Sequence, residues 1–275
     1  MDSIEFHSRY VSKKPDTKGF ITYATEENHI WNTLYERQIK IVQGRACDEY
    51  LHGLEKLKLN EKAIPQLPEV NKRLDALTGW SVHPVAALIS AEEFFTLLAH
   101  RQFPAATFIR TMEELNYIKE PDIFHELFGH CPMLTEPVFA DFVQEYAKLV
   151  LACDKSDWPL LQRLFWFTVE FGLILTDKGL RIYGGGILSS IGETAYAVES
   201  PLPQRQLFNT LVALRTPYRI DQMQSVYFVI QSYQELYDFT KNNFSSFLRK
   251  AHELGEFSPL FSVEPGNPSI HICAC

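Results

Sequence analysis

Two histidines stand five residues apart in the segment PDIFHELFGHCP, residues 121–132. On a regular α-helix, residues four apart lie about 40° from each other around the axis, and residues five apart about 140°. His125 and His130 therefore do not fit the HExxH pattern of zinc proteases, in which both rings face one ion. One metal can bind both rings if the helix ends or distorts at Gly129, before Pro132 stops its regular continuation. The spacing leaves open two unrelated histidines, one packed and one capping a helix end.

A third ligand candidate is Glu170, which lies in a largely apolar segment, residues 164–175. On a helix its neighbours would include Phe167, Phe171 and Ile174, so its face would be mostly apolar. An unpaired buried charge costs several kcal/mol, so we expect a buried carboxylate that is compensated by a partner or a cation. The alternative is a solvent-facing glutamate on an amphipathic helix. Two imidazoles and one carboxylate with open positions are the donor set of non-haem Fe(II) oxygenases, whereas a four-ligand zinc site is closed.

The bulk composition restricts the remaining function classes. The chain has 275 residues, 46% hydrophobic and 13% aromatic, enough to bury a large core. The formal net charge is -8 and no basic run stands out, so we expect no nucleic-acid partner. The longest apolar zone, residues 160–175, is interrupted by polar residues, and the N-terminus lacks the apolar core of a signal peptide. We therefore expect a cytoplasmic protein without a membrane span.

The cysteines give a weaker signal. There are five, an odd number without framework spacing, which is typical of reduced thiols in a reducing compartment. Cys273 and Cys275 form a CxC pair at the very end of the chain. We expect this pair to be a frayed end without a function rather than a metal or redox site.

Apolar periodicity, caps and breakers predict one mainly helical domain with small β elements (an α+β fold) over residues 1–275, in which residues 1–20 form a loosely attached arm. A strand is expected over residues 103–110 and a loop at residues 184–186. Helices are expected at residues 26–51 (one or two), 69–77, 90–98 with a capping box, from 122 onwards, 135–153, 157–177, 190–198, 206–213 and 226–248.

Three motifs, PDIFHELFGHCP, WFTVEFG and YGGGILSSIGE, together resemble the catalytic domain of the pterin-dependent aromatic amino acid hydroxylases. The likeness runs over about residues 79–239 and is closest to the phenylalanine-specific members of bacterial type. It implies a monooxygenase that converts L-phenylalanine to L-tyrosine with O2, tetrahydropterin and Fe(II). It also implies a single catalytic domain without a regulatory or coiled-coil tetramerisation domain, working as a monomer or dimer.

The resemblance assigns roles to individual residues. It implies that His125, His130 and Glu170 ligate iron, and that Ser189 orients the second of the two histidines. Arg110 is expected to hold the substrate carboxylate, because a guanidinium fork pairs with two oxygens at once. Asp122 would support that arginine. The other implied substrate contacts are Pro121, Trp166, Ser189 and Ile220. The implied pterin contacts are Val85, Ala87, Leu88 and Ile89 through the backbone, Phe94 by stacking, Glu126 beside the iron, and Phe165.

Several positions depart from the animal members of that family. Ile118 and Ala91 each stand where a hydroxyl-bearing residue is expected, and Phe165 stands where a tyrosine is expected. Ile220 occupies a position where the tyrosine-specific members carry an acid, which favours phenylalanine as the substrate. Two rival functions stay open: a metallohydrolase with Glu126 as general base, and a non-catalytic helical binding module whose histidines are structural.

Overall fold

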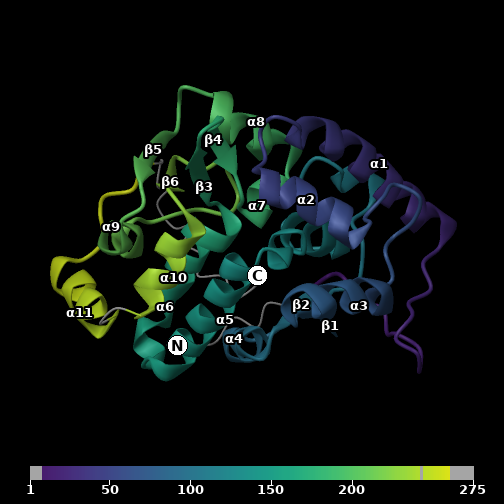
Figure 1. The fold of residues 1–275 in the computed structure, drawn as a ribbon, viewed down its shortest axis with the longest axis horizontal. Helices are drawn as coiled ribbons and strands as arrows, with labels where there is room; N and C mark the ends of the chain where they lie inside the picture. Colours follow the sequence, from purple (N-terminus) through teal and green to yellow (C-terminus); the bar gives the residue numbers. More distant parts are fainter. Residues whose placement is uncertain (1–7, 242–243, 261–275) are drawn as a thin grey trace.

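The protein is mainly helical with six short strands, as the ribbon of the computed structural model shows for its described residues, 8–241 and 244–260 (Figure 1). The predicted fold class is confirmed. Cys273 and Cys275 lie outside the described residues. The helices are α1 (Thr25–Val42), α2 (Asp48–Leu57), α3 (Leu67–Thr78), α4 (Ala91–Ala99), α5 (Pro137–Ala152), α6 (Trp158–Phe165), α7 (Gly185–Leu188), α8 (Ile191–Glu199), α9 (Thr210–Arg215), α10 (Tyr233–Lys241) and α11 (Phe244–Leu254). The strands are β1 (Ser81–Val85), β2 (Gln102–Ala106), β3 (Leu173–Thr176), β4 (Gly179–Ile182), β5 (Gln204–Leu207) and β6 (Val226–Ile230).

Helix α5 lies at the centre of the molecule and packs against both α4 and α10 (Figure 1). The parallel pair β1–β2 lies on the same side as α3 and α4. The four-stranded sheet, in the order β4-β3-β6-β5, lies on the other side, near α9 and α10. Within this sheet β3 pairs antiparallel with β4, whereas β6 runs parallel to both β3 and β5. The site described below forms between these two halves of the core.

Most predicted helices are confirmed, and local capping chemistry explains where they begin and end. Helix α4 begins after Ser90, whose Oγ accepts a hydrogen bond from the Glu93 amide at 3.1 Å. Helices α3, α5 and α6 each have a proline in the first turn, where no hydrogen bond to its nitrogen is needed. Helix α3 ends at Gly79 with a φ of 73°, the left-handed conformation that favours glycine.

Three helix predictions were wrong in part, and the strand predicted over 103–110 is shorter than expected, since β2 ends at Ala106. The helix predicted over 157–177 ends at Glu170, and Leu173–Thr176 is strand β3, joined to β4 by a turn at Gly179 with a φ of 94°. A glycine with positive φ serves a hairpin turn as well as a helix end, so the sequence DKG does not separate the two. Strands β5 and β6 replace the starts of the helices predicted at 206 and 226. Short apolar runs of four or five residues do not distinguish strand from helix by periodicity.

Residues 8–13 of the predicted arm contact the body of the protein. The ring of Tyr10 stacks on Phe108 with a centroid distance of 4.4 Å. Thr107 is bonded twice, from its amide to Ser12 Oγ at 3.1 Å and from its hydroxyl to the Lys13 carbonyl at 2.7 Å. This part of the arm therefore runs beside the segment that leads to Arg110. Among the described helices, none is long and apolar enough to cross a membrane.

Candidate metal centre and active-site cavity

The two segments that carry the ligand candidates are both π-helical turns. His125–His130 forms one, in which the Cys131 amide donates to the Glu126 carbonyl at 3.3 Å. Trp166–Glu170 forms the other, in which the Phe171 amide donates to the Trp166 carbonyl at 2.8 Å. A π-helix bonds each residue to the fifth one along, so its wider turn brings residues five apart back to the same side. The predicted distortion is real, but it extends over the whole turn instead of being confined to Gly129.

Glycines let the chain segments around this centre approach each other closely. A Cβ on Gly129 would lie 2.7 Å from the Gly185 carbonyl oxygen, and a Cβ on Gly185 would lie 2.3 Å from His130 Nδ1. A Cβ on Gly186 would lie 3.0 Å from Glu170 Oε2. The predicted loop at 184–186 was wrong in part, because Gly185 and Gly186 open the short helix α7. Helix α7 packs against both π-helical turns. At Gly129, Gly185 and Gly186 this close approach leaves no room for a side chain.

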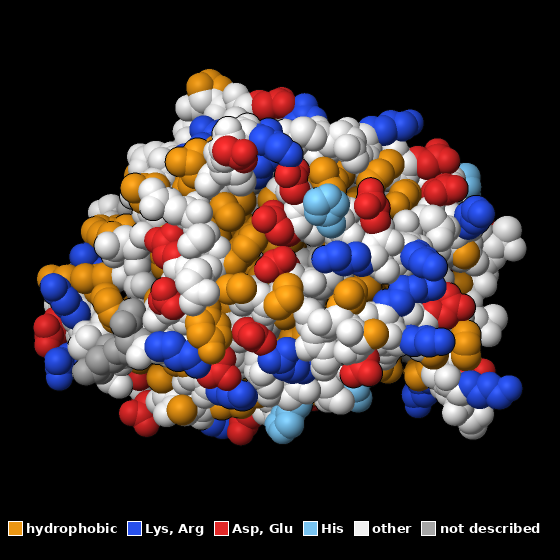
Figure 2. All heavy atoms as spheres, viewed as in Figure 1, with side chains coloured by type: hydrophobic (Ala, Val, Ile, Leu, Met, Phe, Trp, Pro, Cys, Tyr) orange, Lys and Arg blue, Asp and Glu red, His pale blue; other side chains and the backbone are white. Residues whose placement is uncertain are grey.

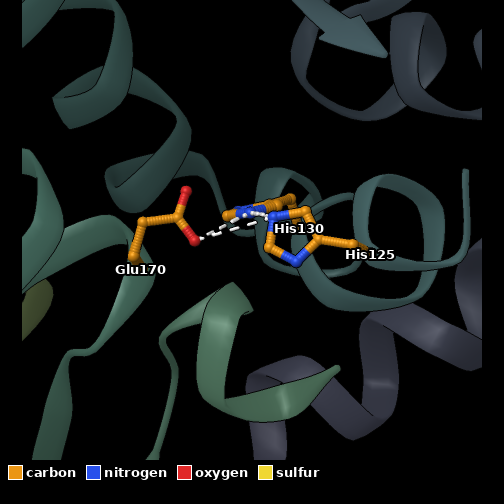
Figure 3. A group of neighbouring side chains, drawn as sticks. All are labelled: His125, His130 and Glu170. Carbon is orange, nitrogen blue, oxygen red and sulfur yellow. Dashed lines mark hydrogen bonds and ion pairs between the residues drawn. The ribbon is translucent and has the colours of Figure 1, made fainter. Parts of the chain in front are cut away.

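His125, His130 and Glu170 point towards one another (Figure 3). The Nε2 atoms of the two histidines are 3.0 Å apart. Glu170 Oε2 lies 3.2 Å from His130 Nε2 and 3.7 Å from His125 Nε2. Two atoms that each lie about 2.1 Å from one metal ion, at a right angle, are about 3.0 Å apart. Within residues 8–241 and 244–260, these three form a group whose ligand atoms all lie within 4.8 Å of one another. The donor geometry therefore fits a single metal ion.

Ser189 fixes the tautomer of His125. The Ser189 hydroxyl donates to the Gly185 carbonyl at 2.9 Å, so its oxygen is an acceptor for the imidazole Nδ1–H of His125, also at 2.9 Å. With the proton on Nδ1, the Nε2 atom carries the lone pair that a metal needs. The resemblance implied that Ser189 orients the second histidine. The structure corrects this, because the hydroxyl bonds to the first histidine, His125.

The charge states of the ligands suit a cation. Burial raises the pKa of the Glu170 carboxyl, but the neighbouring His130 and His125 and the Gly186 amide outweigh it, and the pKa is lowered overall. Burial, together with His130, lowers the pKa of His125 to about 4. Near neutral pH Glu170 is thus charged and His125 neutral, which are the forms that bind metal. The prediction of a buried, compensated carboxylate is confirmed, with Glu170 only 4% exposed.

Arg110 and Asp122 form a buried bidentate pair. Arg110 Nε and Nη2 donate to the two carboxylate oxygens of Asp122, each at 2.8 Å. Asp122 also accepts the backbone amides of Arg110 at 3.0 Å and His125 at 3.1 Å. Asp122 therefore holds the arginine and the start of the first π-helical turn in one arrangement. It takes two of the five N–H groups of the guanidinium, and Arg110 also lines the cavity beside the metal ligands.

A cavity of about 420 Å³ lies beside the metal-ligand candidates. His125 and Glu170 are part of its lining. Several residues that the sequence predicted for the substrate and the pterin line it as well: Arg110, Pro121, Trp166, Ser189, Ile220, Ile89, Phe94 and Phe165. Ile118 and Ala91, which like Phe165 lack an expected hydroxyl, also face it. Its described lining does not include Asp122, Val85, Ala87, Leu88 or Glu126. On the face in Figure 2, hydrophobic side chains reach the surface near the middle, among charged ones.

An aromatic stack in this cavity was not predicted from the sequence. The indole of Trp166 lies between Phe171 and Tyr218, with centroid distances of 4.3 and 4.5 Å. Phe171 directly follows Glu170 in the motif, so its place beside the site could have been inferred. Tyr218 stands two residues before Ile220, and only a link between that segment and the motif around Trp166 would have revealed it. Phe94, expected to stack on a pterin, meets Phe165 edge to face at 5.5 Å.

Glu126 is buried, at 4% exposure, next to His125 in the chain. Burial, with added repulsion from Glu170 and Asp122, raises the pKa of its carboxyl well above the ordinary value. The raised pKa favours the protonated form of this carboxyl, which can donate a hydrogen bond.

Two imidazoles and one carboxylate on one side of an ion, beside an apolar cavity, define a mononuclear non-haem iron site of the oxygenase class. A family model described as biopterin-dependent aromatic amino acid hydroxylase matches residues 5–262. The chain belongs to this family, as its three motifs predicted.

Relatives and solved structures agree with this assignment. A phenylalanine-4-hydroxylase of Pseudomonas aeruginosa is 53% identical over 254 residues, 92% of this chain and 97% of the relative. One from Vibrio cholerae is 46% identical over 92% of this chain and 88% of its own length. The structure of phenylalanine hydroxylase from Legionella pneumophila matches with a TM-score of 0.90 and 64% identity over 92% of this chain and all of that one. The structure of the Chromobacterium violaceum enzyme with bound iron(III) and 7,8-dihydrobiopterin matches with a TM-score of 0.84 and 40% identity. The match covers 92% of this chain and 93% of that one.

Proposed function

We propose that this protein hydroxylates L-phenylalanine to L-tyrosine, using O2, a tetrahydropterin and Fe(II) held by His125, His130 and Glu170. The observation that carries the proposal is the convergence of these three donors beside an apolar cavity. It is supported by relatives named phenylalanine-4-hydroxylase that are matched along nearly their whole length. Bound iron would activate O2, and the tetrahydropterin would supply the electrons and take up the oxygen atom that does not go to the ring.

The residues of the chain bind and orient the substrate in this proposal. Arg110 pairs with the substrate carboxylate through the N–H groups that Asp122 does not take. Pro121 and Trp166 form apolar walls for the ring, so that one carbon of the ring faces the metal. Ser189 keeps His125 in the tautomer that binds iron.

The pterin occupies the part of the cavity near the start of α4. Phe94 and Phe165 give it an aromatic wall, with Ile89 beside them. The backbone groups of Val85, Ala87 and Leu88 and the carboxyl of Glu126, which lie outside the described lining of the cavity, stay the proposed hydrogen-bonding partners of the pterin. Phe165 and Ala91 offer no hydroxyl here, so we expect the pterin to be held mainly by stacking and backbone groups.

Phenylalanine is the preferred substrate because the wall of the cavity is apolar where a phenol would need a partner. Ile220 lines it there and offers no hydrogen-bonding side chain. Burying a hydroxyl without a partner is unfavourable, so tyrosine is disfavoured as a substrate relative to phenylalanine.

The test is an assay in which Fe(II)-loaded protein, phenylalanine and tetrahydropterin are mixed without oxygen and then exposed to air. Tyrosine should form only after oxygen enters, with one labelled oxygen atom when ¹⁸O2 is used. A folded, iron-loaded protein that makes no tyrosine under these conditions refutes the proposal.

The rival function, a metallohydrolase, needs an ionised general base beside the metal. Glu126 is its candidate, and its place outside the described lining of the cavity argues against that role. Zinc-loaded protein that cleaves peptides without pterin or O2 would restore the rival.

We further propose that the working unit is a monomer or dimer, since one chain supplies the donor set and the cavity lining. Light scattering after size-exclusion chromatography tests the oligomeric state.

A further inference from the structure

The indole of Trp166 is held at its edge as well as on its two faces. Its faces stack on Phe171 and Tyr218, and its Nε1–H donates to Gln224 Oε1 at 3.0 Å. Stacking alone lets a ring slide or turn in its own plane. A hydrogen bond at the edge removes that freedom, so the bond to Gln224 fixes which edge of the indole faces the cavity.

The amide of Gln224 is itself held in one orientation. Its Nε2 donates to the backbone carbonyls of Arg219 at 2.6 Å and Gln222 at 3.1 Å. If the amide were flipped, its oxygen would face these two carbonyl oxygens, which would repel it. The side chain is only 4% exposed, so water cannot replace the lost bonds easily. The oxygen of Gln224 is therefore committed to the indole.

The backbone of Gln224 is anchored by a buried acid that the proposed reaction does not use. Glu193 on α8 accepts the Gln224 amide at 3.0 Å and the hydroxyl of Tyr227 on β6 with the same oxygen. Its side chain is buried, at 5% exposure for the residue. Burial raises the pKa of Glu193, and the two hydrogen bonds oppose that rise. Glu193 thus ties the segment that carries Gln224 to both α8 and the sheet.

We infer that Gln224 is a positioning residue that sets the angle of the Trp166 ring and thereby the fit of the cavity to the aromatic ring of the substrate, an inference that rests on the proposed function. Gln224 and Glu193 line the cavity as Trp166 does, but the polar atoms of the Gln224 side chain are bonded to Trp166, Arg219 and Gln222, so Gln224 acts through the indole. Glu193 acts one step further away, by holding Gln224. The ligand class concerned is an amino acid with a flat, apolar ring, and the network selects by the size and tilt of that ring.

The kinetic test replaces Gln224 with leucine. Loss of one buried hydrogen bond corresponds to a factor of about three to ten in an equilibrium constant, so Gln224→Leu should raise KM for phenylalanine by that factor. We expect kcat to change by less than about twofold, KM for pterin to stay the same, and the preference for phenylalanine over tryptophan to fall. Trp166→Phe removes the same bond from the other side and should raise KM at least as much. In the Trp166→Phe background, Gln224→Leu should add no further change, and an equal added effect would overturn the inference.

A second measurement is independent of activity. In ¹⁵N-labelled, zinc-loaded protein, the indole N–H signal of Trp166, assigned with Trp166→Phe, should shift and lose exchange protection in Gln224→Leu. Gln234→Leu makes the same chemical change on the exposed side of α10 and should leave that signal unchanged. An unshifted signal with parental KM in folded Gln224→Leu refutes the inference. If the parent makes no tyrosine, the proposed function fails, while this signal still decides whether Gln224 positions Trp166.

Discussion

The Nε2 atoms of His125 and His130 lie 3.0 Å apart, although a regular α-helix would place residues five apart on different sides. The π-helical turn of His125–His130 resolves this conflict, because its hydrogen bonds join residues five apart. Glu170 reaches the same point from the end of a second π-helical turn. The metal centre is therefore built from two local departures from α-helical geometry, each fixed by packing against α7.

Gly129→Ala should destabilise the protein and lower its metal content. The new Cβ would lie 2.7 Å from the Gly185 carbonyl oxygen, which is backbone and cannot move aside cheaply. We expect a loss of about 1–3 kcal/mol in the free energy of unfolding, typical of overpacking, and a weaker metal site because the first turn shifts. Denaturant unfolding and iron analysis after desalting measure both. Gly192→Ala is the matched control, because its added Cβ would meet only the flexible end of the Met223 side chain, which can move aside. Parental stability and iron content in Gly129→Ala would contradict this account of the turn.

Ser189→Ala should weaken metal binding while leaving the fold intact. Without the hydroxyl, the proton of His125 is no longer held on Nδ1, and the ring loses its orienting partner. Loss of such a partner typically costs about 10- to 100-fold in metal affinity. Competition with a chelator of known affinity measures the change, with the exposed Ser258→Ala as control. Equal affinities in the two variants would show that Ser189 does not set the tautomer.

Much of the metal centre could be predicted because its chemistry is local in sequence. The motif around His125 and His130 and the buried Glu170 were both visible as unusual residues in an apolar setting. The mode of convergence was only partly predictable, since a π-helical turn has no sequence signature as clear as a cap or a breaker. Ser189 was assigned to the wrong histidine because the packing of α7 on the first turn is a tertiary contact.

The helices of the fold were predictable wherever a cap or a proline marks their start, as at Ser90 and Pro137. Strands β3 and β6 were missed because both are short and apolar, and their pairing joins residues far apart in the chain. Gln224 and Glu193 gave no signal at all. A buried glutamine and a buried glutamate become informative only once the fold brings them to Trp166 and Tyr227.

Asp122→Asn should reduce both stability and substrate affinity. The change leaves the buried Arg110 without its ion-pair partner, and breaking such a pair by one substitution costs about 3–5 kcal/mol. The arginine should also lose its fixed orientation, so KM for phenylalanine should rise while KM for pterin changes little. Thermal unfolding and steady-state kinetics measure the two effects. Asp141→Asn breaks an ion pair between partly exposed side chains and should cost less than about 1 kcal/mol. If the two variants lose equal stability, the buried pair is not the structural support described above.

The metal-free protein should lose stability as the pH falls from about 6.5 towards 4. Burial and the nearby His130 lower the pKa of His125 from 6.5 to about 4. Between these values the unfolded chain binds a proton at this residue and the folded chain does not, so acid favours unfolding. The contribution of His125 is complete above pH 6.5, falls by at most about 1.4 kcal/mol per pH unit below it, and levels off below pH 4. Denaturant unfolding at several pH values, compared with His125→Gln, isolates this contribution because glutamine does not titrate. A His125→Gln curve as steep as that of the parent would mean that the pKa of His125 is not lowered by folding.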